Sequence, residues 1–229
     1  MGQNMSPAVM ARRVEPHDSL DYFPTPPWAT RALCEWLVAN ELIEPGLGTV
    51  WEPACGEGHM ARPLGEYFGE VWASDVHDHG IGMPVADFLI ANTGPCDPRR
   101  PDWVITNPPF NLGEAFVQRA ARVALEGCAM FVRTAFLESV GRYQALFQAR
   151  PPSAILQFAE RVVLAKGVCR DPAVAYLDEI TGRMKKPSTA TAYCWIVWLF
   201  PSPGQCAFGW IGPRRARLTR AGDYDRVRS

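Results

Sequence analysis

GTVWEPACGEGHM, residues 48–60, joins a short apolar run to a turn that contains two glycines. The apolar run breaks at Pro53 and has the length of a buried strand. The continuation GEGHMARPLGEYF is typical of a glycine-rich turn that leads into a helix. Glycines at the carboxyl end of a strand let backbone N–H groups approach a ligand closely, as Gly56 and Gly58 would here. Taken alone, the turn also fits an ordinary tight connection.

Strand and helix patterns alternate on both sides of this turn. Residues 25–42 place apolar side chains at helical spacing, with Thr25 as the expected N-cap. GEAFVQRAARVAL predicts another helix, and further strands are predicted by EVWASDV, DWVITNPPF, CAMFVRTAF, SAILQFA and TAYCWIVWLF. Parallel neighbours need crossover connections, so the alternation predicts an α/β fold with a doubly wound, mostly parallel sheet.

Length and composition predict one domain. The chain has 229 residues, of which 48% are hydrophobic and 21% charged, enough for one sizeable core but not for two full domains. We expect a flexible leader over residues 1–20, a domain over 21–213 with an irregular insertion at about 161–191, and a basic, flexible tail over 214–229. We also expect a monomer or a weak homodimer.

Charge and cysteine content exclude several classes of protein. A net charge of −1 argues against a polybasic protein, although a local basic patch can still bind nucleic acid. The seven cysteines are scattered and form no CxxC pair, which fits reduced thiols in a cytoplasmic protein. The longest apolar run, CWIVWLF, is much shorter than a membrane span, so no membrane association is expected.

The histidines give little support for a metal site. His77 and His79 form an HxH pair, with His59 or Cys96 as the nearest candidates for further ligands. No complete ligand set and no zinc-type spacing is visible. We therefore expect no metal cofactor.

Acidic residues after two strands indicate a nucleoside site. Asp75 ends the strand EVWASDV, 17 residues after Gly58, where a carboxylate can accept both hydroxyl protons of a ribose. Asp87 and Phe88 suit the amine and the ring face of adenine, although Phe88 also fits ordinary core packing. The glycine turn has no GK[ST] ending and no third glycine, so pyrophosphate is not the expected ligand. A cofactor that carries adenosine without phosphates, such as S-adenosylmethionine, fits this turn better than a nucleotide.

The tetrapeptide NPPF, residues 107–110, follows the strand DWVIT directly. Pro108 and Pro109 fix two φ angles and remove two backbone donors, which makes a stiff corner. The side-chain oxygen of Asn107 and the carbonyl of Pro108 can accept both protons of a planar amine while Phe110 stacks on its ring. Such an amine attacks poorly, so acceptors that favour a pyramidal nitrogen would assist methyl transfer from an adjacent sulfonium.

Together these segments resemble the γ-ordered DNA adenine-N6 methyltransferases of the class I S-adenosylmethionine-dependent fold, including short phage-like members. The resemblance covers roughly residues 21–200. YFPTPP is similar to the N-terminal cofactor motif of that family, EPACGEG to its glycine loop, Asp75 and ADF to its adenosine contacts, and NPPF to its catalytic DPPY or NPPF motif. Phe110 replaces the frequent tyrosine, which keeps the stacking face and loses a hydroxyl.

The resemblance implies a seven-stranded sheet with the last strand antiparallel, a flipped adenine as substrate and S-adenosylmethionine as cofactor. The implied catalytic residues are Asn107, Pro108, Pro109 and Phe110. The implied cofactor-binding residues are Tyr22, Thr25, Pro26, Glu52, Pro53, Ala54, Gly56, Gly58, Asp75, Asp87, Phe88 and Asn107.

DNA contacts are expected mainly from the insertion, because no large target-recognition segment follows the catalytic core. A charge run is more often a solvated face, so DNA contact by Lys185 and Lys186 stays open. The candidate nucleic-acid-binding residues are Arg133, Arg161, Lys166, Arg183, Lys185 and Lys186, with Arg170 and the arginines of the tail as further cations. Two alternatives also remain open: a planar amine in RNA or protein (guanine N2 or glutamine), and a non-catalytic nucleic-acid-binding relative.

Overall fold

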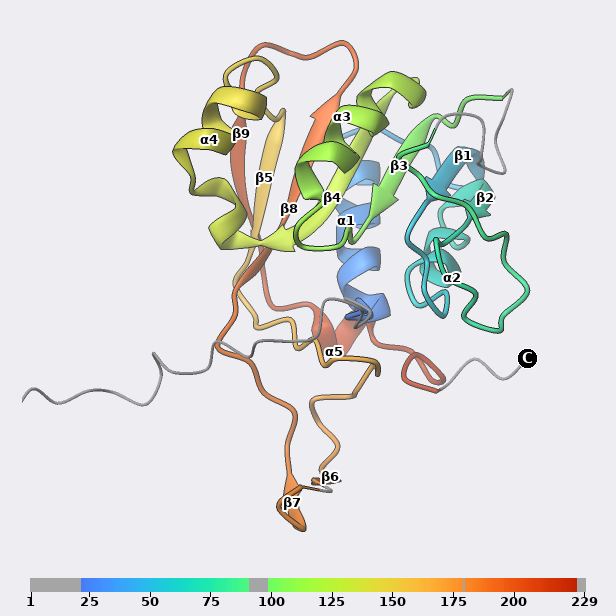
Figure 1. Ribbon diagram of the computed structural model, residues 1–229, viewed down its shortest axis with the longest axis vertical. Coiled ribbons are helices and arrows are strands. Elements are labelled where there is room, and N and C mark those ends of the chain that lie inside the picture. Colours follow the sequence, from blue (N-terminus) through green and yellow to red (C-terminus); the bar gives the residue numbers. More distant parts are fainter. Residues whose placement is uncertain (1–21, 91–98, 179, 226–229) are drawn as a thin grey trace, which may run out of the picture.

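The computed structural model describes residues 22–90, 99–178 and 180–225, so the expected leader (residues 1–20) lies outside the described residues. Seven strands form one sheet in the order β2-β1-β3-β4-β8-β5-β9 (Figure 1). Their bounds are β1 (Leu47–Glu52), β2 (Phe68–Ala73), β3 (Trp103–Thr106), β4 (Gly127–Arg133), β5 (Ala154–Phe158), β8 (Tyr193–Leu199) and β9 (Ala207–Ile211).

The sheet is mostly parallel, which confirms the predicted fold class. β8 is antiparallel to both of its neighbours, β4 and β5, and all other pairs in this sheet are parallel. One detail corrects the expectation: the antiparallel strand is not the last, because β9 follows it and pairs with β5 in parallel. β9 was not predicted from the sequence, because Gly209 interrupts its apolar residues. In the structure the side chains of Phe208 and Trp210 in this strand are exposed.

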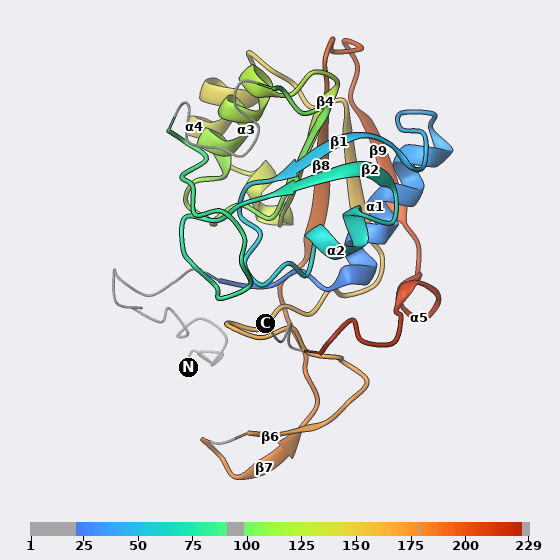
Figure 2. The same ribbon diagram turned by 90° about the vertical axis from the view of Figure 1, so that its right-hand side faces the viewer.

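Helices cover both faces of the sheet (Figure 2). α1 (Pro27–Ala39) and α2 (Ala61–Leu64) lie on one face, and α3 (Gly113–Val123) and α4 (Val140–Arg142) lie on the other. A 3-10 turn (Thr134–Leu137) precedes α4, and a π-helical turn (Tyr143–Phe147) follows it. No helix among the described residues is long and apolar enough to span a membrane.

The helix predicted after the glycine turn is present but only one turn long, because Pro63 lies inside it and Gly65 ends it. One local expectation about α1 is wrong. Thr25 does not cap α1: the N-cap position is Pro26, no side chain caps the helix, and the Thr25 hydroxyl is buried without a hydrogen-bond partner among the described residues.

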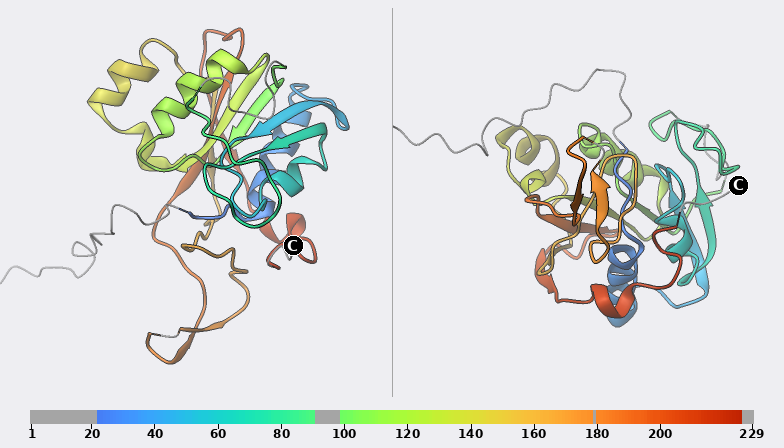
Figure 3. Two further views of the ribbon diagram at one scale, coloured as in Figure 1. Left: turned by 45° about the vertical axis from the view of Figure 1, so that its right-hand side comes forward. Right: turned by 90° about the horizontal axis from the view of Figure 1, so that it is seen from below.

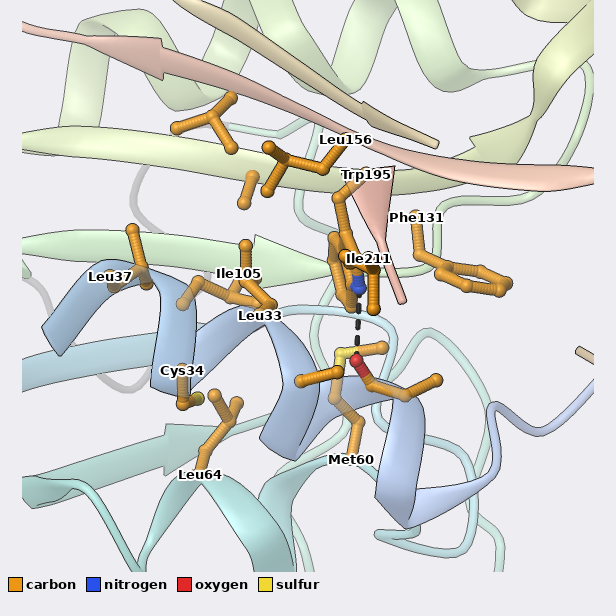
Figure 4. Packing of buried hydrophobic residues seen from close by; sticks show 14 of the residues in the cluster. Leu33, Cys34, Leu37, Met60, Leu64, Ile105, Phe131, Leu156, Trp195 and Ile211 are labelled. Atoms are coloured by element: carbon orange, nitrogen blue, oxygen red, sulfur yellow. Dashed lines mark hydrogen bonds between the residues drawn. The ribbon is translucent and has the colours of Figure 1, made fainter. Parts of the chain in front are cut away.

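Alternate residues of the central strands build two hydrophobic cores, one on each face. In β3, Trp103 and Ile105 belong to the core beneath α1, whereas Val104 belongs to the core beneath α3. Figure 4 shows the first core, where Trp195 of β8 donates a hydrogen bond from Nε1 to the carbonyl of Ala29 at 3.0 Å. This bond ties α1 to the middle of the sheet and satisfies a buried polar group.

The carboxyl ends of β1, β2, β3, β4 and β5 meet at one edge of the sheet, which we call the carboxyl edge (Figure 1). The insertion leaves this edge at the end of β5 and returns to it at the start of antiparallel β8. It is less irregular than expected, because β6 (Tyr176–Asp178) and β7 (Arg183–Lys185) pair as an antiparallel hairpin. Figure 3 shows this hairpin projecting from the body of the protein on the side of the carboxyl edge.

Residues 214–225 differ from the expected flexible basic tail. They include α5 (Arg215–Leu218), and four arginines pair with carboxylates instead of standing free: Arg214 and Arg217 with Glu35, Arg215 with Glu160, and Arg220 with Glu66. Residues 226–229 lie outside the described residues. The segment therefore belongs to the folded domain.

A buried arginine of α1 holds this segment in place. The guanidinium of Arg31 donates to Asp223 at 2.7 and 2.9 Å, to Glu66 and to the carbonyl of Leu218. The Arg31 side chain is 4% exposed and that of Asp223 is 7% exposed. A buried cation with this many acceptors is stable in place, but it tolerates the loss of an acceptor poorly.

We expect Asp223→Ala to lower the free energy of unfolding by about 3 kcal/mol, because the change leaves the buried Arg31 with one carboxylate instead of two. Urea unfolding, followed by circular dichroism, measures this loss. The matched control is Asp225→Ala, which removes an exposed carboxylate of the same segment and is expected to shift stability by less than about 0.5 kcal/mol. Equal stability of the two variants would show that the Arg31 cluster does not anchor the segment.

Candidate active site

A cavity of about 460 Å³ opens at the carboxyl edge. Its walls come from the segment before α1, the ends of β1 and β2, the loop after Ala86 and the corner after β3. The predicted site residues that line it are Tyr22, Thr25, Glu52, Pro53, Ala54, Asp75, Asp87, Phe88, Asn107, Pro108, Pro109 and Phe110. Pro26, Gly56 and Gly58 are not among the lining residues. The structure thus brings into one pocket residues that are up to 88 positions apart in sequence (Tyr22 and Phe110).

Tyr22 closes the glycine turn from outside. Gly56 has a φ of +52°, and a Cβ atom there would lie 2.2 Å from Cε2 of the Tyr22 ring, so only glycine fits. The hydroxyl of Tyr22 accepts a hydrogen bond from the backbone N–H of Glu57 at 3.2 Å. Burial raises the pKa of this phenol above its ordinary value, so Tyr22 stays neutral. Gly56 therefore permits the aromatic packing that shapes this wall.

Asp75 connects the turn to the neighbouring loop. Its carboxylate accepts from the backbone N–H of Gly56 at 2.9 Å and from that of His77 at 3.0 Å. Nε2 of His79 lies 3.5 Å from the same carboxylate, and the His79 ring packs on Tyr22 with centroids 4.9 Å apart. The carboxylate lines the cavity at the end of β2, where a ribose could reach it.

Asp87 and Phe88 lie on the adjoining wall. Asp87 Oδ1 accepts from the backbone N–H of Leu89 at 2.8 Å, which fixes the loop. Phe88 is 2% exposed and packs against Trp51 and Phe116, with ring centroids 5.0 and 4.9 Å away. The alternative of core packing therefore applies to Phe88, which belongs to the core beneath α3 and also lines the cavity.

Two buried polar atoms face this region without protein partners. Thr25 Oγ1 and Glu52 Oε2 have no hydrogen-bond partner among the described residues, although the two residues are only 3% and 2% exposed and both line the cavity. Burial, and secondly the charge of Asp75, raise the pKa of the Glu52 carboxyl well above its ordinary value. Buried polar groups are normally satisfied, so an unpaired hydroxyl and an unpaired carboxyl oxygen on one cavity suit a polar ligand.

His59 also lines the cavity, which was not predicted from the sequence. Burial, with a smaller effect from the charge of Arg62, lowers its pKa to about 4. The imidazole is therefore neutral at physiological pH, with Nδ1 3.5 Å from the hydroxyl of Tyr22. The position of His59 next to the glycine turn was the signal in the sequence that it could line the cavity.

The NPPF corner is held against the segment before α1. Nδ2 of Asn107 donates a hydrogen bond to the carbonyl of Phe23 at 2.8 Å, which leaves Oδ1 as the acceptor of this amide. The carbonyl of Pro109 accepts from the N–H of Leu112 at 2.9 Å. The ring of Phe110 lies 5.2 Å from that of Phe23, centroid to centroid. The corner is therefore fixed from both sides, and the Asn107 amide has one defined orientation.

The predicted nucleic-acid-binding residues fall into two groups. Arg133 reaches the site itself, with its guanidinium carbon 3.8 Å from the centre of the Phe110 ring. The others lie in the insertion, where Arg161 donates to the carbonyl of Ala190 and Lys185 lies 3.6 Å from Asp178. Arg183 and Lys186 are exposed on or beside β7, and Lys166 precedes Gly167, whose N–H donates to the carbonyl of Tyr22 at 2.9 Å.

The absence of a metal site remains a prediction. Among residues 22–90, 99–178 and 180–225 there is no group of three or more histidine, cysteine, aspartate or glutamate side chains that could hold a metal ion. Cys96, one of the weak candidates for a ligand, lies outside the described residues.

Comparisons identify the fold. No protein-family model and no curated protein matches the sequence. A protein of Listeria monocytogenes described as a class I S-adenosylmethionine-dependent methyltransferase superimposes with a TM-score of 0.54 at 12% identity, covering 84% of this chain and 67% of that one. The modification subunit of a type I restriction enzyme from Vibrio vulnificus gives 0.54 at 15% identity, covering 89% and 51%. An RNA methyltransferase from Pyrococcus horikoshii gives 0.54 at 15% identity, covering 81% and 91%.

The chain has the class I methyltransferase fold. The likeness at these identities extends to the fold and no further, and the chain spans about half the length of the restriction subunit that it matches. In this fold the cavity lies outside the carboxyl ends of the parallel strands, which is where open α/β sheets bind ligands. The position of the cavity in this protein follows that rule.

We expect Glu52→Gln to stabilise the unliganded protein at neutral pH, by on the order of 1 kcal/mol. The folded-state pKa of Glu52 is raised, so the wild type loses stability as pH rises above about 4.5, where the unfolded chain releases a proton that the folded protein retains. The variant has no such proton. Urea unfolding between pH 4.5 and pH 8 measures how the free energy of unfolding of the wild type and of the variant changes with pH.

The control for this measurement is Glu44→Gln, at an exposed carboxyl far from the cavity. Its stability is expected to follow the wild-type pH dependence. If Glu52→Gln also followed it, the Glu52 carboxyl would not be held in its neutral form.

Proposed function

We propose that the protein is a methyltransferase that transfers a methyl group from S-adenosylmethionine to the exocyclic N6 amine of adenine in DNA. One observation carries the proposal: the residues of the glycine turn, the acidic strand end and the NPPF corner line a single cavity. The neighbour described as a class I S-adenosylmethionine-dependent methyltransferase and the neighbour described as a modification subunit of a type I restriction enzyme support this proposal.

The cavity suits each part of the cofactor. Asp75 at the end of β2 would bind the ribose hydroxyls, and Asp87 with Phe88 would contact the adenine. The unpaired Thr25 hydroxyl and the unpaired Oε2 of Glu52 suit the amino-acid end, which carries an ammonium and a carboxylate. An ammonium next to Glu52 would favour the ionised carboxylate, so binding would release a proton from a group whose pKa is raised. When bound, S-adenosylmethionine supplies an electrophilic methyl group on a sulfonium.

The NPPF corner would orient the target amine. Because Asn107 Nδ2 donates to Phe23, its Oδ1 and the carbonyl of Pro108 are the acceptors for the two amine protons. Two acceptors draw both N–H groups to one side, so the nitrogen lone pair becomes less delocalised and points toward the methyl group. The nitrogen held in this way would accept the methyl group that the cofactor supplies, with S-adenosylhomocysteine as the other product, and would lose one amine proton to solvent. Phe110 would hold the base by stacking.

The insertion would supply DNA contacts. It leaves and re-enters the domain at the carboxyl edge, on the side of the cavity, and its sequence from 161 to 191 carries six basic and three acidic residues. Phosphates attract such a segment. Four apolar side chains on or beside the hairpin are also strongly exposed, namely Val174, Leu177, Ile180 and Met184. We propose the hairpin as the DNA-reading element, since a two-stranded ribbon fits the major groove.

RNA and protein amines are the second candidates. The two acceptor oxygens and the ring of the NPPF corner would suit any planar NH2 group. One of the neighbours is described as an RNA methyltransferase. The YFPTPP and EPACGEG segments resemble DNA adenine enzymes, which favours DNA.

Transfer of a deuterated methyl group from S-adenosylmethionine tests the substrate class. Duplex DNA, single-stranded DNA, RNA and protein are incubated separately, and the products are digested and analysed by mass spectrometry. We expect labelled N6-methyladenine from DNA. Label on guanine N2 of RNA or on glutamine would contradict the DNA assignment, and cofactor binding without transfer to any substrate would favour a non-catalytic relative.

We expect Asn107→Ala to lower the rate of methyl transfer by at least roughly 10²–10³-fold, because it removes an acceptor for the amine. Cofactor affinity is expected to stay within about threefold, since the acceptor acts on the substrate. Asn40→Ala, which removes an exposed amide at the end of α1, is the control and is expected to retain full activity. Turnover of Asn107→Ala at the wild-type rate would refute the role of this amide.

A further inference from the structure

Arg133 lies over the ring of Phe110, the ring that would stack on the target base in the proposed function. It ends β4, which is the parallel neighbour of β3, and β3 leads directly into the NPPF corner (Figure 1). The guanidinium carbon of Arg133 is 3.8 Å from the centre of the Phe110 ring. This is van der Waals contact, so no planar ring fits between them unless Arg133 moves.

Phe110 has protein neighbours besides Arg133. Phe23 packs against it with the ring planes inclined by 41°, and Phe110 also contacts the core beneath α1. Arg133 is the exposed one of these neighbours, so its displacement would make room on the ring without moving Phe23 or the core.

Arg133 differs from Arg99, which also lies over an aromatic ring, in having no carboxylate partner among the described residues. Arg99 lies over the ring of Trp72 at 4.7 Å and also pairs with the carboxylate of Glu70. Arg133 is exposed, and among the described residues no carboxylate forms an ion pair with it. Its guanidinium therefore has a ring as a neighbour but lacks an anion.

We infer that Arg133 occupies the place of the target base and exchanges it for a phosphate when the base enters. The base stacks on Phe110 in the position of the guanidinium, and the displaced guanidinium pairs with a phosphate of the same strand. This inference rests on the proposed action on DNA. It assigns to Arg133 a phosphate contact that forms only when a base occupies the pocket.

Both halves of the exchange are favourable. A cation over an aromatic ring at an exposed site is held more weakly than a base stacked on the same ring. A guanidinium gains a charge-assisted, bidentate contact when it moves from the ring to a phosphate. Without DNA, the arginine keeps the aromatic face covered.

Binding of two single-stranded oligonucleotides tests the exchange without requiring catalysis. One is a 12-residue deoxyadenosine oligonucleotide, and the other is the same backbone with abasic sites throughout. Their dissociation constants are measured over a range of salt concentrations for the wild type, Arg133→Met and Arg99→Met. Arg133→Met is expected to reduce the slope of log Kd against log salt by roughly 0.7 for the adenine strand, the value of one phosphate contact, and to leave the abasic slope unchanged.

Arg99→Met is the control, because it removes an exposed arginine from a ring that does not line the cavity, and it is expected to change neither slope. An equal reduction for both oligonucleotides would overturn the exchange, since Arg133 would then bind phosphate without a base. No change for either would overturn it too. If the wild type bound neither oligonucleotide in a salt-dependent manner, the proposed action on DNA would fail first, and this inference with it.

Discussion

The hydrogen bond from Asn107 Nδ2 to the carbonyl of Phe23 joins two segments that are 84 residues apart. It connects the segment before α1 to the corner after β3, and both line the cavity. It also selects the orientation of the Asn107 amide, because the donor end is used by Phe23. The acceptor end is then the part of the side chain that can receive a proton from a substrate. The two prolines alone would make the corner stiff, and this hydrogen bond also fixes which way the Asn107 amide points.

Around this bond, the fold forms a cavity whose lining combines buried polar and aromatic side chains. The glycine turn is drawn in by Asp75 and covered by Tyr22, so its close packing depends on Gly56. Thr25, Glu52 and His59 are buried polar residues of its lining, and burial favours the neutral forms of Glu52 and His59. Phe110 is a less buried residue of the lining, and Arg133 lies over its ring. A cationic cofactor and a planar substrate fit this combination, because the two sets of side chains offer different chemistry.

Much of this arrangement could be predicted from local sequence. The apolar runs gave the central strands, since each is long enough to be buried, and the alternation with helices gave the parallel sheet. Residues at strand ends, such as Asp75 and Asn107, were predictable as cavity residues because the carboxyl ends of parallel strands share one edge.

The features that escaped prediction depend on contacts distant in sequence. The four tail arginines were read as free charges, but Glu35, Glu66 and Glu160 neutralise them after folding. Threonine is a common N-cap residue, but in the folded protein Thr25 lines the cavity and does not cap α1. Arg133 was a candidate for phosphate, whereas its contact with Phe110 appears only when β3 and β4 are side by side.

A crystal structure with S-adenosylhomocysteine tests the central claim most directly, because it shows where the sulfur lies relative to the NPPF corner. We predict that the sulfur points toward Asn107 Oδ1 and the Pro108 carbonyl, with the ribose on Asp75 and the amino-acid end at Thr25 and Glu52. Ligand bound outside this cavity, or an Asn107 amide whose oxygen is turned into the protein, would contradict the account.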